Sequence, residues 1–230
     1  MSSQRTQRKI IIIGGTGKQG SAVINALLSS KSAPSLYLAT LTRNPQAKKA
    51  LELKERGVEL VQIDLDEVTV DHSVFFQLAG ADGLFVAQAI SDKEVEEGRT
   101  IINAAEKAGV EQVVYSSVGQ AHDAPYPGAL ILRFSILAQA FLNPEKYDRQ
   151  SIELAADKMN GHQLSQTFSK VLGRPMKYEK MKPRDESSRL MVQWIENNNF
   201  LVDVEALKKE HELNLKSVED FIKDNKHVFE

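Results

Sequence analysis

The feature that most constrains the fold is a glycine-rich loop that directly follows an apolar run. Residues 9–13 are Lys-Ile-Ile-Ile-Ile, and residues 14–20 are Gly-Gly-Thr-Gly-Lys-Gln-Gly. A continuous apolar run of this kind is typical of a strand buried on both faces of a parallel sheet. After the loop, apolar residues recur at helical spacing, at Val23, Ile24, Leu27 and Leu28. The sequence therefore predicts a strand, a tight glycine turn and a helix, in that order.

The same strand-then-helix order continues up to residue 118. Further strands are expected at 36–42, 58–63, 83–87 and 112–116. Helices are expected at 46–56, near 73–78, and from a capping Asp92 to Gly109. The inward face of the last helix is expected to be Val95, Ile101, Ile102 and Ala105. This alternation predicts an α/β protein with a Rossmann-like doubly wound parallel sheet, in a domain of residues 1–128.

The pattern changes beyond residue 119, where Pro125, Pro127 and Gly128 interrupt it. Residues 129–230 are expected to form a small C-terminal α/β lobe. Its strands are expected at 151–154 and 176–181, and its helices at 161–171, 190–197 and 204–226, the last with a break near 213–215.

Composition removes several classes of protein. The chain has no Cys, which excludes disulfide scaffolds, cysteine zinc sites and thiol nucleophiles. Its 29 Lys and Arg against 31 Asp and Glu give a net charge of −2, which disfavours nucleic acid or an anionic membrane as a direct partner. The five His residues share no metal spacing, so no metal site is predicted. We expect a cytoplasmic protein, with the nucleus as an alternative location.

The glycine loop has the spacing and the setting of a dinucleotide site. A pyrophosphate needs close approach to the backbone and N–H groups at a helix N-terminus. Gly14, Gly17 and Gly20, which end the first strand and open the first helix, meet both needs. The alternative is a plain tight turn between a strand and a helix.

The end of the second strand bears on cofactor choice. Thr42 to Pro45 contain no Asp or Glu to hold a ribose 2′-hydroxyl, whereas Arg43 can pair with a 2′-phosphate. This favours NADP over NAD, with NAD as the alternative. Lys48 adds charge nearby or is a surface residue. Asp64 either accepts a hydrogen bond from the adenine amino group or caps a helix. Gln88 is a candidate ligand contact only because it lies at the carboxyl edge of the expected sheet.

Catalytic residues are not predicted. Ser116 and Ser117 follow the fifth strand, where a short-chain dehydrogenase places its serine, but that chemistry also needs a Tyr-x-x-x-Lys pair on the next helix. Tyr126 comes after these serines but is followed by Pro127, which disfavours the helix that such a pair needs. The Tyr-x-x-x-Lys spacing occurs only at Tyr178 and Lys182, in an expected strand, and we interpret it as chance.

Several motifs together resemble the NmrA-like branch of the atypical short-chain dehydrogenases. They are the glycine loop, Leu-Thr-Arg-Asn-Pro at 41–45, Gln-Ile-Asp-Leu-Asp at 62–66, Val-Val-Tyr-Ser-Ser-Val at 113–118 and, later, Asn-Pro-Glu-Lys-Tyr at 143–147 and Val-Leu-Gly-Arg-Pro at 171–175. The resemblance lies within residues 8–226. It implies binding of NADP or NAD, and either a redox-sensing regulator with a protein partner such as a transcription factor or a reductase of small molecules such as quinones.

The resemblance also implies cofactor contacts, residue by residue. The expected contacts are Gly14, Gly15, Thr16, Gly17, Lys18, Gln19, Gly20, Arg43, Asn44, Pro45, Gln46, Ala47, Asp64, Leu65, Gln88 and Lys93.

The middle of the chain departs from the family pattern. Only residues 119–128 separate the fifth strand from 129–134, and Ile131 to Arg133 is an expected remnant of a sixth strand. A crossover between parallel strands needs at least about 10–12 residues including its helix. We hypothesise that an internal segment is missing, which leaves the nicotinamide half of the site incomplete. The expected function is therefore a redox-sensing or regulatory NADP-binding protein with little or no catalysis. The alternatives are an NADPH-dependent oxidoreductase of quinone-like molecules and an inactive truncated form.

Overall fold

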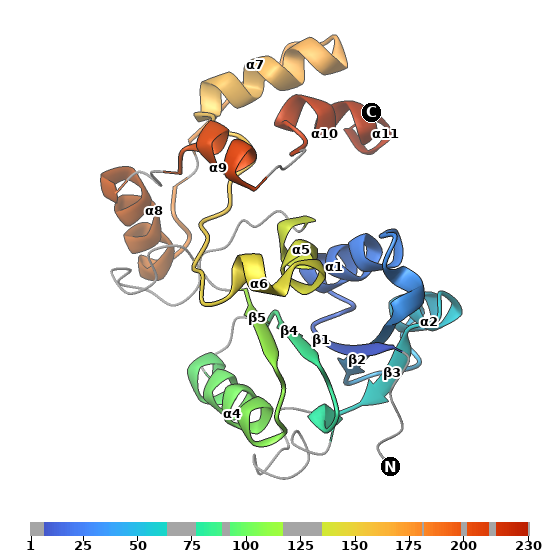
Figure 1. Cartoon of the computed structure of the whole chain (residues 1–230). Helices are drawn as coiled ribbons and strands as arrows, with labels where there is room; N and C mark the ends of the chain where they lie inside the picture. The colour runs from blue at the N-terminus through green and yellow to red at the C-terminus, as the bar shows by residue number, and fades with distance from the viewer. Residues whose placement is uncertain are drawn as a thin grey trace, which may run out of the picture. The chain divides into compact units, whose positions relative to one another are not determined.

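The chain forms two compact units in a computed structural model (Figure 1). The first comprises Met1–Ser117 and Phe134–Gln150, and the second comprises Val118–Arg133 and Ser151–Glu230. The structure describes residues 7–63, 77–88, 93–116, 135–180, 182–198, 202–211 and 215–229.

A five-stranded sheet forms the centre of the first unit. The strands are β1 (Arg8–Ile13), β2 (Leu36–Thr42), β3 (Glu59–Gln62), β4 (Gly83–Val86) and β5 (Gln112–Tyr115). All pair in parallel, in the spatial order β3-β2-β1-β4-β5. This confirms the predicted doubly wound sheet. The strand order reverses between β1 and β4, and open α/β sheets bind their ligands at such a point, beyond the carboxyl ends of the strands.

Helices cover both faces of the sheet, as the all-apolar run in β1 predicts (Figure 1). Ile11 and Ile13 pack with α4 (Glu94–Lys107) on one face. Ile10 and Ile12 pack on the other face with α1 (Lys18–Leu28), α2 (Lys48–Glu55) and α5 (Ser135–Leu142). The connection from α1 to β2 contains the short helix η1 (Ala33–Ser35), and α6 (Pro144–Tyr147) follows α5.

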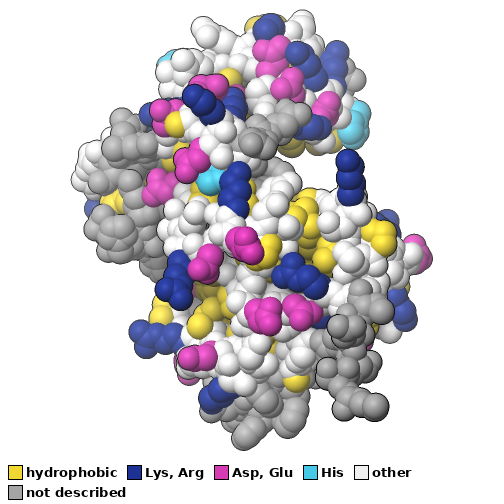
Figure 2. Space-filling view, in the orientation of Figure 1, with side chains coloured by type: hydrophobic (Ala, Val, Ile, Leu, Met, Phe, Trp, Pro, Cys, Tyr) yellow, Lys and Arg dark blue, Asp and Glu magenta, His cyan; other side chains and the backbone are white. Residues whose placement is uncertain are grey.

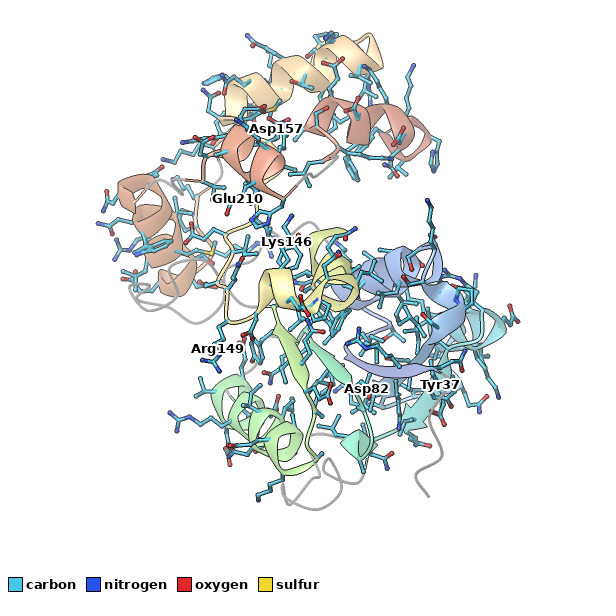
Figure 3. All side chains as sticks on the ribbon, viewed as in Figure 1. Tyr37, Asp82, Lys146, Arg149, Asp157 and Glu210 are labelled. Carbon is cyan, nitrogen blue, oxygen red and sulfur yellow. The ribbon has the colours of Figure 1, made fainter. Side chains whose placement is uncertain are left out.

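The alignment of β1 and β4 is fixed by Asp82, which lies just before β4 (Figure 3). Its carboxylate accepts from the backbone N–H of Lys9 at 2.6 Å, and its own N–H donates to the Lys9 carbonyl at 2.8 Å. Side chain and backbone of one residue therefore hold the start of both strands in register. The same register brings the ends of β1 and β4 together at Ile13 and Val86.

Two of the four residues expected on the inward face of α4 are exposed. Ile101 and Ala105 are buried, whereas Val95 is 68% exposed and Ile102 is 39% exposed. Ala104 and Thr100 are buried instead. Val95 and Ile102 are seven positions apart and share a stripe more than a third of a turn away from the centre of the buried one. Asp92, the expected cap of this helix, lies outside the described residues.

Helix α5 belongs to the first unit, although residues 129–230 were all expected in the second lobe. The ring of its wholly buried Phe141 lies 2.9 Å from where a Cβ on Gly83 would be. The last carbonyls of α5 accept hydrogen bonds from the sheet: Ala140 from Gln112 at 2.6 Å and Phe141 from Arg8 at 2.7 Å. The helix is therefore tied to both β1 and β5. The expected strand remnant at 131–133 lies outside the described residues.

The regular elements described in the second unit are all helices. It contains α7 (Gly161–Leu172), α8 (Glu186–Asn198), α9 (Val204–Glu210), α10 (Val218–Asp224) and α11 (Lys226–Phe229). The helices expected at 161–171 and 190–197 are confirmed, as is a break within 204–226. The strands expected at 151–154 and 176–181 are wrong for their described residues, which are irregular. At 176 the reason is visible: the Met176 N–H donates to Ser169 Oγ on α7 rather than to another strand.

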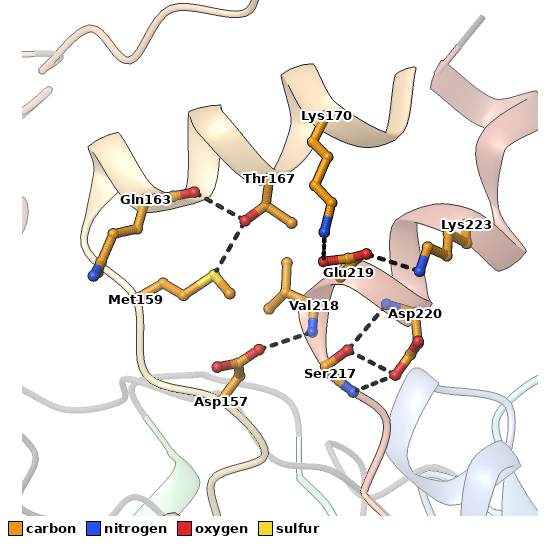
Figure 4. A network of polar contacts seen from close by, with 10 residues as sticks. All are labelled: Asp157, Met159, Gln163, Thr167, Lys170, Ser217, Val218, Glu219, Asp220 and Lys223. Carbon is orange, nitrogen blue, oxygen red and sulfur yellow. Dashed lines mark hydrogen bonds and ion pairs between the residues drawn. The ribbon is translucent and has the colours of Figure 1, made fainter. Parts of the chain in front are cut away.

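Polar contacts join α7 to α10 in this unit (Figure 4). Lys170 on α7 pairs with Glu219 at 2.8 Å, and Glu219 also pairs with Lys223 at 2.8 Å. Asp157 accepts from the N–H of Val218 at 3.0 Å, at the first residue of α10. Lys170 and Glu219 therefore link the two helices, and Asp157 holds the start of α10. In the part of the chain that the structure describes, no helix is long and apolar enough to cross a bilayer.

Candidate functional site

The glycine loop lies at the carboxyl end of β1 and leads into α1. The Gly17 N–H donates to the Gly14 carbonyl at 2.9 Å and closes the turn. Gly17 is the N-cap of α1, with no side-chain cap and no acidic residue in the first turn. The first N–H groups of a helix have no acceptor within it, and the helix dipole makes this end positive. The loop therefore presents unneutralised donors to an anion.

The loop is wedged between the neighbouring strand ends. Gly14 has a φ of +82°, and a Cβ there would lie 2.3 Å from the Ala87 carbonyl oxygen, just after β4. A Cβ on Gly15 would lie 2.1 Å from Thr40 Oγ1 in β2, and one on Gly20 would lie 2.3 Å from the Gly14 carbonyl oxygen. None of these positions has room for a side chain.

Gly17 differs from the other glycines of the loop. Its backbone is ordinary, with φ −79° and ψ 173°, and the nearest atom to a Cβ would be the Gly14 carbonyl oxygen at 3.1 Å. Protein packing thus explains Gly14, Gly15 and Gly20 but barely explains Gly17. The spacing of the glycines marks Gly14, Gly17 and Gly20, whereas the packing reason for Gly15 has no local signal because Thr40 lies 25 residues away in the sequence.

The turn after β2 places cations at the start of α2. Arg43 is exposed, and Asn44 shapes the turn: its Oδ1 accepts from the Gln46 N–H at 3.0 Å and its carbonyl from the Ala47 N–H at 3.2 Å. The first turn of α2 begins at Lys48, includes Lys49 and contains no acidic residue. Cations at the positive end of a helix are unfavourable by themselves, so this arrangement is suited to a bound anion.

Gln88, beyond β4, is directed toward α4 and β5. Its Nε2 donates to the Glu94 carbonyl at 3.2 Å and to the Glu97 carboxylate at 3.3 Å, and its Oε1 accepts from the Tyr115 hydroxyl. Because Gly98 has no side chain, the Gln88 Oε1 and the Tyr115 hydroxyl can come together beside it; a Cβ there would lie 2.8 Å from both oxygens. Lys93 is the exposed N-cap of α4. The structure thus places Gln88 in a network with the protein itself.

The same network acts on the Tyr115 hydroxyl. Burial, and then the carboxylates of Glu94 and Glu97, raise the pKa of Tyr115. The hydroxyl therefore keeps its proton at neutral pH and serves as a donor to Gln88.

Two buried oxygens near the carboxyl edge have no hydrogen-bond partner among the described residues. They are Oε1 of Gln19, in the first turn of α1, and Oγ of Ser116, directly after β5. Gln19 is only 9% exposed. A buried acceptor or hydroxyl without a partner costs free energy, and a ligand often supplies the missing bond.

Other predicted positions lie elsewhere or outside the described residues. Asp64, Leu65, Ser117 and Tyr126 are outside them. Tyr178 lies in an irregular segment of the second unit, where its ring packs edge-on against His162 at 5.4 Å. It shares no helix with Lys182, as the chance interpretation of that motif requires. The described residues contain no group of three or more potential metal ligands.

The chain is similar in sequence to known proteins. The sequence profile of the NmrA-like family matches residues 6–130. An NAD(P)H azoreductase of Xenophilus azovorans is 36% identical over 117 residues, which cover 50% of this chain and 38% of the azoreductase. The NmrA-like family domain-containing oxidoreductase malD of Malbranchea aurantiaca is 35% identical over 121 residues, which cover 48% of this chain and 34% of malD. The matched part therefore spans little more than a third of these relatives.

Solved structures share the fold at low sequence identity. NmrA, a negative transcriptional regulator solved in complex with NADP, has a TM-score of 0.73 at 15% identity, and the match covers 98% of this chain and 97% of NmrA. Triphenylmethane reductase of Citrobacter sp., solved with NADP(H), has a TM-score of 0.72 at 17% identity, with 94% and 99% covered. At these identities the likeness establishes the architecture alone.

Proposed function

Because the chain belongs to the NmrA-like family, we propose that it binds NADP(H) at the glycine loop and acts as a redox-sensing or regulatory protein with little or no catalysis. The backbone amides of residues 16–20 take the pyrophosphate, and Arg43 takes the 2′-phosphate. The observation that carries the proposal is the loop itself. Its helix end has no side-chain cap and its glycines are closely packed, so backbone N–H groups remain available to bind an anion. NmrA and triphenylmethane reductase, solved with NADP and NADP(H), support it by analogy.

The choice of NADP over NAD rests on charge at the start of α2. Residues 43–49 contain Arg43, Lys48 and Lys49 and no carboxylate. An NAD-selective site places a carboxylate at the end of this strand to accept from the ribose 2′-hydroxyl. A 2′-phosphate would instead pair with the Arg43 guanidinium and be stabilised by the positive end of α2.

The residues present fit a dinucleotide beyond the phosphates as well. Gln19 Oε1 and Ser116 Oγ are buried polar atoms without partners among the described residues, and both lie near the carboxyl edge where the rest of the cofactor would extend. Bound NADPH would supply a hydride there. Ser116 and Gln19 would contribute hydrogen bonds, which orient a ligand but do not transfer a proton by themselves.

The proposal of little catalysis rests on the proton donor. Among the described residues at this edge, the tyrosine is Tyr115, whose hydroxyl donates to Gln88 and whose pKa is raised first by burial and then by the carboxylates of Glu94 and Glu97. A tyrosine that transfers protons near neutral pH needs a neighbouring cation to lower its pKa instead. The ten residues 119–128 also leave little length for a crossover helix. A regulatory protein partner and a cytoplasmic or nuclear location complete the proposal.

A reductase of quinone-like or azo molecules is the second candidate. Ser116 favours it, because a buried hydroxyl directly after β5 is suited to hold a carbonyl oxygen. The azoreductase relative is an enzyme of this class by name. An inactive truncated form is the third candidate.

Two assays on the full chain separate these candidates. NADPH fluorescence titration is expected to show binding that Arg43→Glu weakens at least about tenfold, because a charge-assisted contact becomes a repulsive one. Lys31→Glu makes the same charge change at an exposed site beyond the end of α1 and should leave binding unchanged. Affinity unaltered by Arg43→Glu would refute the cofactor assignment. NADPH oxidation with a panel of quinones and azo dyes is expected to stay near the background rate, and turnover above about 1 per second would favour the reductase.

A further inference from the structure

Thr40 is a buried polar residue in the middle of β2. It is wholly buried and pairs in register with Ile12 of β1. Its hydroxyl donates to the Ile12 carbonyl at 2.8 Å. Because threonine is branched at Cβ, this bond fixes both γ atoms in one rotamer. The side chain is therefore a rigid support next to the end of β1.

The glycine loop rests on that support. A Cβ on Gly15 would lie 2.1 Å from Thr40 Oγ1 and 2.8 Å from Thr40 Cβ, so the backbone of Gly15 contacts the threonine side chain directly. On the side of β4, the loop is limited by the Ala87 backbone at Gly14. A backbone wall cannot be altered by mutation of its side chain, whereas the Thr40 support can. Thr40 is thus the side chain nearest to Gly15, with Ile24 Cδ1 next at 3.1 Å from the same Cβ position, and it limits how far the loop can approach the sheet.

We propose that Thr40 is a positioning residue for pyrophosphate binding. Its hydrogen bond to the Ile12 carbonyl holds the backbone of Gly15 in place. The N–H groups of the following residues then lie within reach of the phosphates. Hydrogen-bond donors weaken steeply with distance and angle, so a small shift of the loop lowers affinity. This inference rests on the proposed function, because it needs a dinucleotide in the loop.

The strand also separates two parts of the ligand. Thr40 acts on the pyrophosphate through the loop, whereas Arg43, three residues further along, is assigned to the 2′-phosphate. Adenosine 2′-monophosphate carries the 2′-phosphate but no pyrophosphate. A loss of NADPH affinity without a loss of adenosine 2′-monophosphate affinity is therefore the signature of a positioning role. General loosening of β2 would weaken both ligands.

The test is calorimetric titration of the full chain with NADPH and with adenosine 2′-monophosphate. Thr40→Val, which keeps the shape and removes the hydroxyl, is expected to bind NADPH about tenfold more weakly and adenosine 2′-monophosphate within about twofold of the wild type. Thr40→Ser keeps the hydroxyl and is expected to stay within about twofold for both ligands. Thr100→Val makes the same change at a buried threonine of α4 and is expected to alter neither affinity.

Each other outcome overturns a defined statement. Thr40→Val with unchanged NADPH affinity, or with equal losses for both ligands, would overturn the positioning role alone. A wild-type chain that binds neither ligand would overturn the proposed function and this inference with it. Thermal unfolding without ligand shows whether each variant folds. If Thr40→Val does not fold, Thr40→Ala, which also removes the hydroxyl, takes its place: a tenfold loss of NADPH affinity alone would support the positioning role, and wild-type affinity would overturn it.

Discussion

The two units differ in what holds them together. In the first, wholly buried apolar side chains such as Ile11, Ile12, Phe85 and Phe141 fill both faces of the sheet. In the second, the buried apolar side chains among the described residues are Trp194, Leu207 and Ile222. Burial of apolar area carries no charge to be screened or titrated, whereas exposed ion pairs are weak and are screened by salt. The candidate site is built on the part whose geometry is least dependent on solution conditions.

Caps and ion pairs take the place of a core in the second unit. Asn160 and Ser217 form capping boxes at the starts of α7 and α10, and Asp203 caps α9. In the upper part of Figure 2, where Figure 1 shows α7 and α10, Lys or Arg side chains alternate with Asp or Glu. Local polar contacts thus accompany a smaller set of buried apolar side chains in this unit than in the first. The comparison predicts different responses to matched substitutions.

The largest expected effect is that of Phe141→Ala. The ring is wholly buried between α5 and the sheet, so its loss leaves a cavity and should lower the free energy of unfolding by about 3–5 kcal/mol. Phe221→Ala is the matched control in the second unit, where the side chain is 47% exposed, and should cost less than about 1 kcal/mol. Urea unfolding measures both. Equal losses for the two variants would abolish the distinction between the units.

Gly15→Ala and Gly17→Ala should separate packing from ligand binding within the loop. A methyl group on Gly15 meets Thr40 Oγ1, so Gly15→Ala is expected to destabilise the first unit by about 2–3 kcal/mol. Gly17→Ala meets only the Gly14 carbonyl oxygen at 3.1 Å and should change stability by about 0.5 kcal/mol or less, yet lower NADPH affinity at least about tenfold. Thermal unfolding and NADPH titration give the two readouts. Wild-type NADPH affinity in Gly17→Ala would remove the ligand-based reason for that glycine.

Asn160→Ala should produce a moderate loss confined to the second unit. The side chain accepts from the Gln163 N–H at 2.9 Å, and its removal leaves the start of α7 uncapped at a cost of about 1 kcal/mol. Hydrogen exchange followed by mass spectrometry should show faster exchange in α7 and unchanged exchange in β1 and α1. Faster exchange throughout the first unit would show that the two units unfold together.

The smallest expected effect is a pH dependence at Glu219. Hydrogen bonds from Lys170 and Lys223 lower the pKa of Glu219 to about 2. Because the pKa is lower in the folded state, the contact stabilises fully above the unfolded value near 4.5 and is lost as pH falls toward 2. The protection of the α10 amides, corrected for intrinsic exchange at each pH, should therefore fall as pH is lowered from 4.5 toward 2 in the wild type and vary less with pH in Glu219→Gln. Identical pH profiles for the two proteins would contradict this assignment.

Sequence reasoning located the sheet because each strand carries its own signal. The apolar run before Gly14 and the regular return of strands up to residue 116 predicted all five described strands to within a residue or two at each end. It failed where the outcome depends on a distant partner. The segments at 151–154 and 176–181 have strand-like composition but no strand beside them among the described residues. Val95 and Ile102 are apolar, yet both stay exposed on α4.

The residue types of the candidate site could be predicted from the sequence, but the packing contacts that position them could not. The spacing of the glycines and the absence of a carboxylate after β2 were visible in the sequence. The contact of Gly15 with Thr40, and that of Gly83 with Phe141, join residues far apart in the chain, and no local pattern marks them. Gln88 stays a predicted cofactor contact, and the bonds of its amide to Tyr115 and Glu97 have no local sequence signal either.

The most direct test is isothermal titration of the full chain with NADPH and, separately, with NADH. If the glycine loop and Arg43 form the site described above, NADPH binds at one site per chain and at least about tenfold more tightly than NADH, because only NADPH carries the 2′-phosphate. Absence of NADPH binding, or equal affinity for the two dinucleotides, would contradict an NADP(H) site at this loop.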